Sequence, residues 1–83
     1  MPALRVLIAE DDASIRDLLR HHLLREGLNV CTAGDGNMAL RMARNWAELL
    51  ILDVGLPAID GFEVARALRR EKRELPIIML TAR

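Results

Sequence analysis

The feature that most constrains the fold of this chain is a regular alternation of short apolar segments with longer amphipathic ones. The apolar segments have strand length and lie at residues 4–9, 28–33, 49–53 and 76–81. Between them, apolar residues recur three and four positions apart, which is the spacing of one face of a helix. The resulting β-α-β-α-β-α-β order predicts an α/β fold, with a parallel sheet, right-handed crossovers and helices on both faces.

The three predicted helices are defined by their apolar positions and by the residues that bound them. Asp12 is suited to cap the first helix and Gly27 to follow its last turn. The residues predicted to face the core are Ile15, Leu18, Leu19, His22 and Leu23 in the first helix, Ala39, Leu40, Ala43 and Trp46 or Ala47 in the second, and Gly61, Val64, Ala65 and Leu68 in the third.

Acidic residues follow two of the predicted strands. Glu10 and Asp11 come directly after the first strand, and Asp53 ends the third. The carboxyl ends of parallel strands meet at one edge of the sheet, where ligands bind in such folds. If the first and third strands are neighbours, three carboxylates crowd one crevice and repel one another unless a cation neutralises them or a pKa rises.

Oxygen ligands of this kind favour a hard cation such as Mg²⁺. Thr81 ends the fourth strand and adds a hydroxyl group at the same edge. Carboxylates, a hard cation and a hydroxyl group together suit the binding of a phosphoryl group. Taken alone, Asp53 fits a strand-end cap equally well. Its register with Glu10, Asp11 and Thr81 is what favours a functional site.

Composition excludes several other classes of protein. Twelve basic and twelve acidic residues cancel, so the charge gives no indication of binding to nucleic acid or to an anionic membrane. The single cysteine, Cys31, precludes an intrachain disulfide and fits a reducing compartment. No signal peptide is recognisable and no apolar run could span a bilayer. A cytoplasmic protein is therefore predicted.

Four motifs together resemble the receiver domain of bacterial two-component response regulators. They are VLIAEDD at 6–12, AGDGNMAL at 33–40, LLILDVGLPAIDG at 49–61 and PIIMLTA at 76–82. The resemblance implies a flavodoxin-like parallel sheet of strand order 2-1-3-4. It also implies that residues 1–83 are a single receiver domain that ends after the fourth strand, without the final helix–strand–helix and without an output domain.

The same resemblance implies roles for the residues at the strand ends. Asp53 would be the phosphoacceptor, taking a phosphoryl group from a sensor histidine kinase or a phosphotransfer protein. Mg²⁺ or Mn²⁺ would be held by Glu10, Asp11, Asp53 and the backbone carbonyl of Gly55. The family usually carries a larger residue at position 55.

Two further residues would lie beside the phosphoryl group. The resemblance assigns Thr81 as the hydroxyl that moves to meet it and Ala82 as the small neighbour that tunes access to it. Receivers also contact the phosphoryl group with a lysine that is absent here, because the only lysine, Lys72, precedes the fourth strand.

Three functional hypotheses follow. The first is a signalling switch that is not itself an enzyme and is phosphorylated at Asp53. The second is a truncated, phosphorylation-impaired unit that forms a homodimer through its fourth strand or through uncovered faces of the sheet. The third is a metal-dependent phosphohydrolase, although the second acid that such enzymes often need would fall at Gly55.

Overall fold

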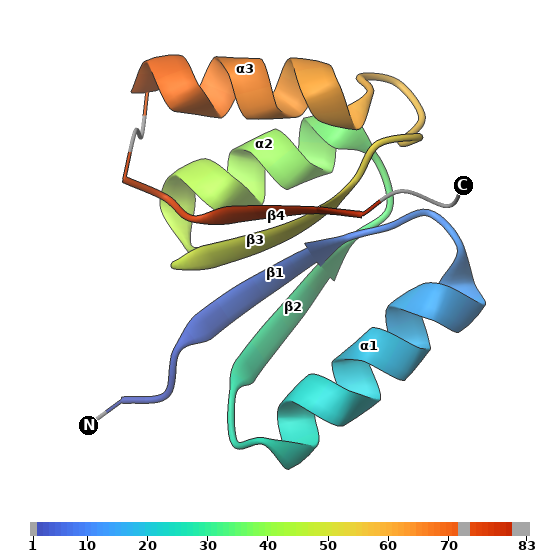
Figure 1. Ribbon diagram of the computed structural model, residues 1–83, viewed down its shortest axis with the longest axis vertical. Helices are drawn as coiled ribbons and strands as arrows, with labels where there is room; N and C mark the ends of the chain where they lie inside the picture. The colour runs from blue at the N-terminus through green and yellow to red at the C-terminus, as the bar shows by residue number, and fades with distance from the viewer. Residues whose placement is uncertain (1, 72–73, 81–83) are drawn as a thin grey trace.

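The computed structural model describes residues 2–71 and 74–80 of the chain, and its elements alternate as the sequence predicts (Figure 1). In chain order they are β1 (Arg5–Ala9), α1 (Ala13–Arg25), β2 (Asn29–Ala33), α2 (Gly36–Asn45), β3 (Leu49–Asp53), α3 (Gly61–Glu71) and β4 (Ile77–Leu80).

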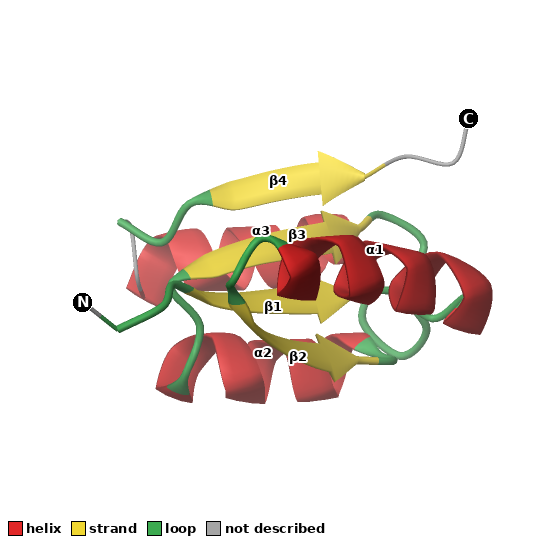
Figure 2. Cartoon of the chain, turned by 90° about the horizontal axis from the view of Figure 1, so that it is seen from below, coloured by secondary structure: helices red, strands yellow, loops and turns green. Residues whose placement is uncertain are grey.

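The four strands form one parallel sheet in the order β2-β1-β3-β4, so the predicted strand order is confirmed. Figure 2 shows all four strands pointing the same way, with α1 on one face of the sheet and α2 and α3 on the other. β1 and β3 are neighbours and pair Ala9 with Leu52. This pairing brings the two predicted acidic strand ends to the same edge of the sheet.

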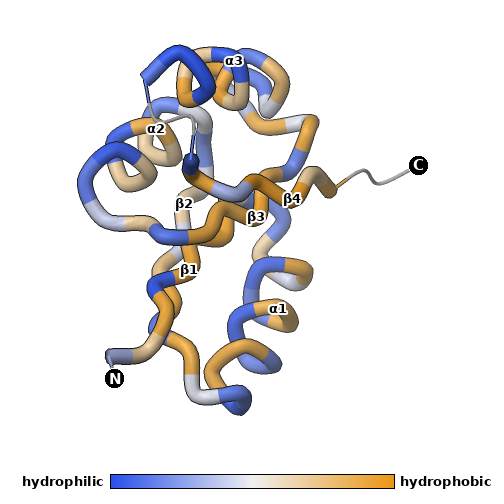
Figure 3. The backbone as a smooth tube through the Cα atoms, turned by 60° about the vertical axis from the view of Figure 1, so that its left-hand side comes forward, coloured by the Kyte–Doolittle hydropathy of each residue, from blue (hydrophilic) through white to orange (hydrophobic). Residues whose placement is uncertain are grey.

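The core is divided by the sheet into two unequal parts. Side chains alternate between the two faces of a strand, so Leu7 and Leu50 face α2 and α3 whereas Val6 and Ile8 face α1. Figure 3 shows that β1, β3 and β4 are apolar along most of their length. This fits β1 and β3, which are covered on both faces, whereas the middle of β4 remains exposed. The larger part of the core lies under α2 and α3.

The predicted apolar faces of α2 and α3 are largely confirmed. The buried residues of these two helices are Gly36, Ala39, Leu40, Ala43, Gly61, Val64 and Leu68. Ala47 is also buried, while Trp46 and Ala65 are partly buried and pack against the same core.

The apolar face predicted for α1 is covered only in part. Leu19 and Leu23 pack against the smaller part of the core, but Ile15 and His22 are exposed and Leu18 is 58% exposed. α1 packs mainly on β1 and β2, so the sheet covers only part of the apolar face of this helix. The prediction that Ile15, Leu18 and His22 face the core was therefore wrong.

No helix in the described part of the chain is both long enough and apolar enough to cross a membrane.

Candidate functional site

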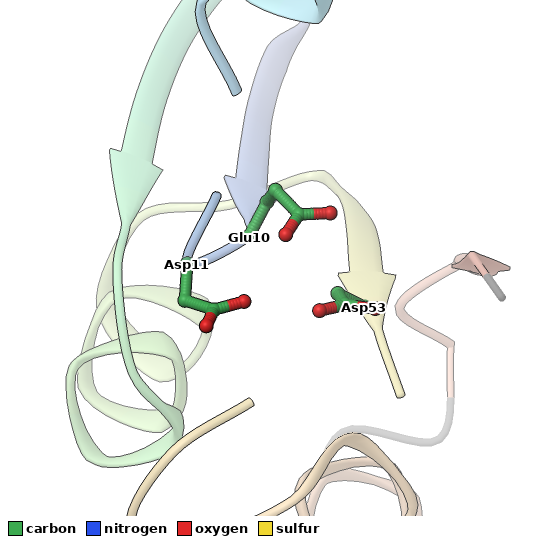
Figure 4. A group of neighbouring side chains, drawn as sticks. All are labelled: Glu10, Asp11 and Asp53. Carbon is green, nitrogen blue, oxygen red and sulfur yellow. The ribbon is translucent and has the colours of Figure 1, made fainter. Parts of the chain in front are cut away.

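The predicted acidic residues meet where β1 and β3 end. Glu10 follows β1 and continues the pairing with β2, since its N–H donates to the carbonyl of Ala33 at 3.0 Å. Asp53 is the last residue of β3. One carboxylate oxygen from each of Glu10, Asp11 and Asp53 lies within 4.8 Å of the other two. Figure 4 shows the three side chains directed toward the same space between the strand ends.

The three carboxylates differ in their exposure to solvent. Glu10 is only 5% exposed, Asp53 is half-buried and Asp11 is exposed. Glu10 Oε2 accepts a hydrogen bond from the N–H of Asp12 at 3.0 Å. Burial raises the pKa of Glu10 above its usual value, and the neighbouring Asp53 and Asp11 carboxylates raise it further against the opposing effect of that hydrogen bond.

The carboxylates of the cluster take part in no ion pair among the described residues. Among the described residues, the ion pairs join Arg5 to Glu48, Arg44 to Glu71 and Arg66 to Glu63, and none of them includes a carboxylate of the cluster. Three oxygen donors this close, with no ion-pair partner in the described ranges, fit a hard divalent cation better than any other common ligand. The donor set therefore suits the magnesium ion that the sequence predicts.

The loop after Asp53 is tied to the strand ends by backbone hydrogen bonds. The N–H of Val54 donates to the carbonyl of Leu80 at 3.1 Å, and the N–H of Gly61 donates to the carbonyl of Val54 at 2.8 Å. Gly55 is exposed beside Asp53. A Cβ at position 55 would lie 3.9 Å from Asp53 Oδ2, an ordinary van der Waals contact, so the space beside Asp53 admits a Cβ there.

Three other aspartates lie at helix N-termini instead of in the cluster. Asp12 accepts hydrogen bonds from the N–H groups of Ser14 and Ile15 at 2.9 and 3.3 Å, which confirms its predicted role as an N-cap. Asp35 accepts from the N–H of Met38 at 2.8 Å. At the start of α3, Asp60 accepts from the N–H of Glu63 at 3.0 Å.

Some predicted positions lie outside the described residues. These are Thr81 and Ala82, which were predicted to contact the phosphoryl group, and the single lysine, Lys72. The last described residue, Leu80, is in register with Asp53.

Sequence reasoning missed two contacts that support the site. Arg16 Nη1 donates to the carbonyl of Glu10 at 3.3 Å and so ties α1 to the end of β1. Gly61 lies directly against the backbone of Asp53. The Asp-Gly pair at 60–61 is visible in the sequence, but it indicates only a turn and does not show what the glycine contacts.

Comparison with known proteins gives one consistent family. The sequence matches the response regulator receiver domain family over residues 6–83. It is 50% identical over 84 residues to the transcriptional regulatory protein AfsQ1 of Streptomyces coelicolor, covering 100% of this chain and 36% of that protein. It is 45% identical over 80 residues to the alkaline phosphatase synthesis transcriptional regulatory protein PhoP of Bacillus subtilis, covering 95% of this chain and 33% of that protein. The chain thus spans about a third of the length of these relatives.

Solved structures agree with this family. The response regulator TrrA of Thermotoga maritima, in complex with Mg(2+)-BeF, is 40% identical with a TM-score of 0.90, covering 96% of this chain and 70% of that one. The receiver domain of the sensor histidine kinase PA1611 of Pseudomonas aeruginosa, with a magnesium ion coordinated in its active site cleft, is 30% identical with a TM-score of 0.91, covering 96% and 68%.

Proposed function

Because the chain belongs to the response regulator receiver domain family of two-component signalling, we propose that Asp53 is its phosphoacceptor. The observation that carries this proposal is the convergence of Glu10, Asp11 and Asp53 at the carboxyl ends of β1 and β3. Asp53 is the candidate among the three because it ends a paired strand and is only half-buried, whereas Glu10 is buried and already accepts a hydrogen bond.

The proposed cofactor is Mg²⁺, with Mn²⁺ as a substitute. Its ligands would be Glu10, Asp11, Asp53 and the backbone carbonyl of Gly55. The crowding of three carboxylates supports this assignment, and so do the two similar receivers, TrrA and PA1611, whose structures contain magnesium. When bound, the ion supplies positive charge that offsets the charge of the phosphoryl oxygens.

The proposed reaction is the transfer of a phosphoryl group to a carboxylate. An Asp53 oxygen attacks the phosphorus atom, an O–P bond forms, and the N–P bond of a phosphohistidine donor breaks. The histidine nitrogen leaves with the electron pair of that bond, and Asp53 becomes an acyl phosphate. The donor would be a sensor histidine kinase or a phosphotransfer protein. Thr81 and Ala82 remain the proposed neighbours of the phosphoryl group.

The test is chemical phosphorylation with acetyl phosphate in the presence of Mg²⁺, followed by intact-mass and peptide mass spectrometry. We expect one phosphoryl group on Asp53, lost in Asp53→Asn and kept in the matched control Asp35→Asn, whose carboxylate caps α2 outside the cluster. Labelling should be slow. The only lysine of the 83 residues, Lys72, precedes the fourth strand, so it is not where receivers place the lysine that pairs with the phosphoryl group. A label that survives Asp53→Asn would overturn the assignment.

A second candidate function is self-association of a phosphorylation-impaired unit. The family match gives it no support. Its support is the outer strand β4, which pairs only with β3 in the described part of the chain and leaves Ile78 50% exposed. An apolar, unpaired strand edge is a surface that recruits another chain.

A further inference from the structure

Gly61, the first residue of α3, lies in unusually close contact with the strand that carries Asp53. A Cβ placed at position 61 would come within 2.3 Å of the carbonyl oxygen of Asp53 and 2.8 Å of the Cα of Val54. Both atoms belong to the backbone, so they cannot move aside as the end of a flexible side chain can. Only a residue without a side chain allows α3 to begin at this position.

The contact of Gly61 with Asp53 and Val54 affects the site, because hydrogen bonds to both α3 and β4 hold this backbone in place. The carbonyl of Val54 accepts a hydrogen bond from the N–H of Gly61 at 2.8 Å, and the N–H of Val54 donates one to the carbonyl of Leu80 in β4 at 3.1 Å. Asp53 is itself in register with Leu80. A shift of the first turn of α3 would therefore be passed to Asp53 instead of being absorbed by a loose loop.

Resting on the proposed function, we infer that Gly61 is a positioning residue for the Asp53 carboxylate. Its missing side chain lets α3 lie against the end of β3 and fixes where Asp53 stands relative to Glu10 and Asp11. Glycine is otherwise a poor choice in a helix, since it loses more backbone freedom than alanine does. The close approach of α3 to the backbone of Asp53 explains why glycine stands here despite its entropic cost.

The main experiment compares Gly61→Ala with Gly27→Ala by calorimetric titration with Mn²⁺. Gly27→Ala is the matched control because it also adds one methyl group at a glycine that the fold needs, here for its φ of +82°, but with no atom within 4 Å. Both variants should lose stability. We expect Gly61→Ala to weaken Mn²⁺ binding by about 10-fold to 100-fold, the range for residues that orient metal ligands. Unchanged Mn²⁺ affinity in Gly61→Ala, with Gly27→Ala also unchanged, would overturn the inference.

A second measurement does not depend on metal. Hydrogen exchange of the Val54 amide reports the bond to Leu80, and it should be faster in Gly61→Ala than in Gly27→Ala after correction for overall stability. If the wild-type chain binds no Mn²⁺, the proposed metal site fails, yet the exchange of Val54 still decides the positioning role. Equal protection in the two variants would then overturn it.

A milder pair of variants covers the case in which Gly61→Ala does not fold. Asp60→Ala removes the carboxylate that caps the first turn of α3, and Asp60→Asn removes the same charge but keeps a side chain that can cap. If the first turn of α3 holds Asp53 in place, Asp60→Ala should weaken Mn²⁺ binding more than Asp60→Asn does. Equal affinities in this pair would contradict the inference.

Discussion

At the scale of single residues, Glu10 has the environment least favourable to its charge. It is nearly buried, it lies beside two other carboxylates, and its pKa is raised in the folded protein, first by burial and then by Asp53 and Asp11. A carboxyl group whose pKa is higher in the folded than in the unfolded state favours folding while it is protonated. That contribution is complete below the unfolded pKa and is lost as the pH rises through the folded pKa.

The metal-free variant Glu10→Gln should therefore be more stable than the wild type at neutral pH. The two proteins should become alike as the pH falls below the ordinary range of a glutamate. Glutamine keeps an oxygen that can accept the Asp12 N–H, so the hydrogen bond is preserved. Urea denaturation over a pH series would measure this difference, with the exposed Glu26→Gln as a control. A lower stability of Glu10→Gln at neutral pH would contradict the prediction.

Removing a carboxylate from the cluster should stabilise the metal-free fold, but it should weaken metal binding. Residues that only orient ligands are worth about 10-fold to 100-fold in affinity, so loss of a direct ligand in Asp11→Asn or Asp53→Asn should cost Mg²⁺ affinity at least about ten-fold. Asp35→Asn, which removes a carboxylate that caps α2, should leave the affinity unchanged. Titration calorimetry would measure all four proteins. If both cluster variants bind Mg²⁺ as the wild type does, the site is assigned wrongly.

The acidic cluster was predictable from sequence because two simple rules converge there. An apolar strand cannot carry a charge in its interior, and the carboxyl ends of parallel strands share one edge. Asp53 and Glu10 follow directly from these rules. Gly61 does not, because a close approach between a helix and a strand depends on how the elements pack, and no local pattern records it.

At the scale of elements, the helix and strand pattern was predictable because each helix has at least one apolar face and each strand an apolar run. The spacing of apolar residues shows which of them share a face, but not how wide a strip the sheet covers. α2 and α3 share the larger part of the core and bury their predicted faces. α1 packs mainly on β1 and β2, so its outer apolar residues, Ile15 and Leu18, stay exposed.

The start of α1 offers a test that separates a cap from a metal ligand. Asp12 caps this helix through the N–H groups of Ser14 and Ile15, and its side chain is not part of the cluster. Asp12→Ala should lower the free energy of unfolding by about 0.5–2 kcal/mol, the usual cost of losing such a cap. Asp12→Asn should lose less, and neither change should weaken Mg²⁺ binding. Chemical denaturation and calorimetry would measure the two effects, and weaker Mg²⁺ binding in both variants would mean that Asp12 is a ligand.

At the scale of the whole molecule, the two faces of the sheet are covered unequally. In the described part of the chain, α2 and α3 lie on one face and α1 lies on the other (Figure 2). Ile78 of β4 is in register with Ile51, which faces the α1 side, yet it remains half exposed. This places an apolar surface beside the edge of β4 that pairs with no other strand in the described part of the chain.

The 83-residue chain should therefore self-associate through this surface, with a closed homodimer as the expected form because it covers both edges at once. Ile78→Lys places a charge on the strand edge and should shift the chain toward monomer. Asn37→Lys adds the same charge at an exposed position at the start of α2, and it should leave the association unchanged. Light scattering during size-exclusion chromatography would measure the mass of all three proteins. A wild-type chain that is monomeric and folds cooperatively at micromolar concentration would contradict the prediction. The exposed apolar surface would then be too small to drive association.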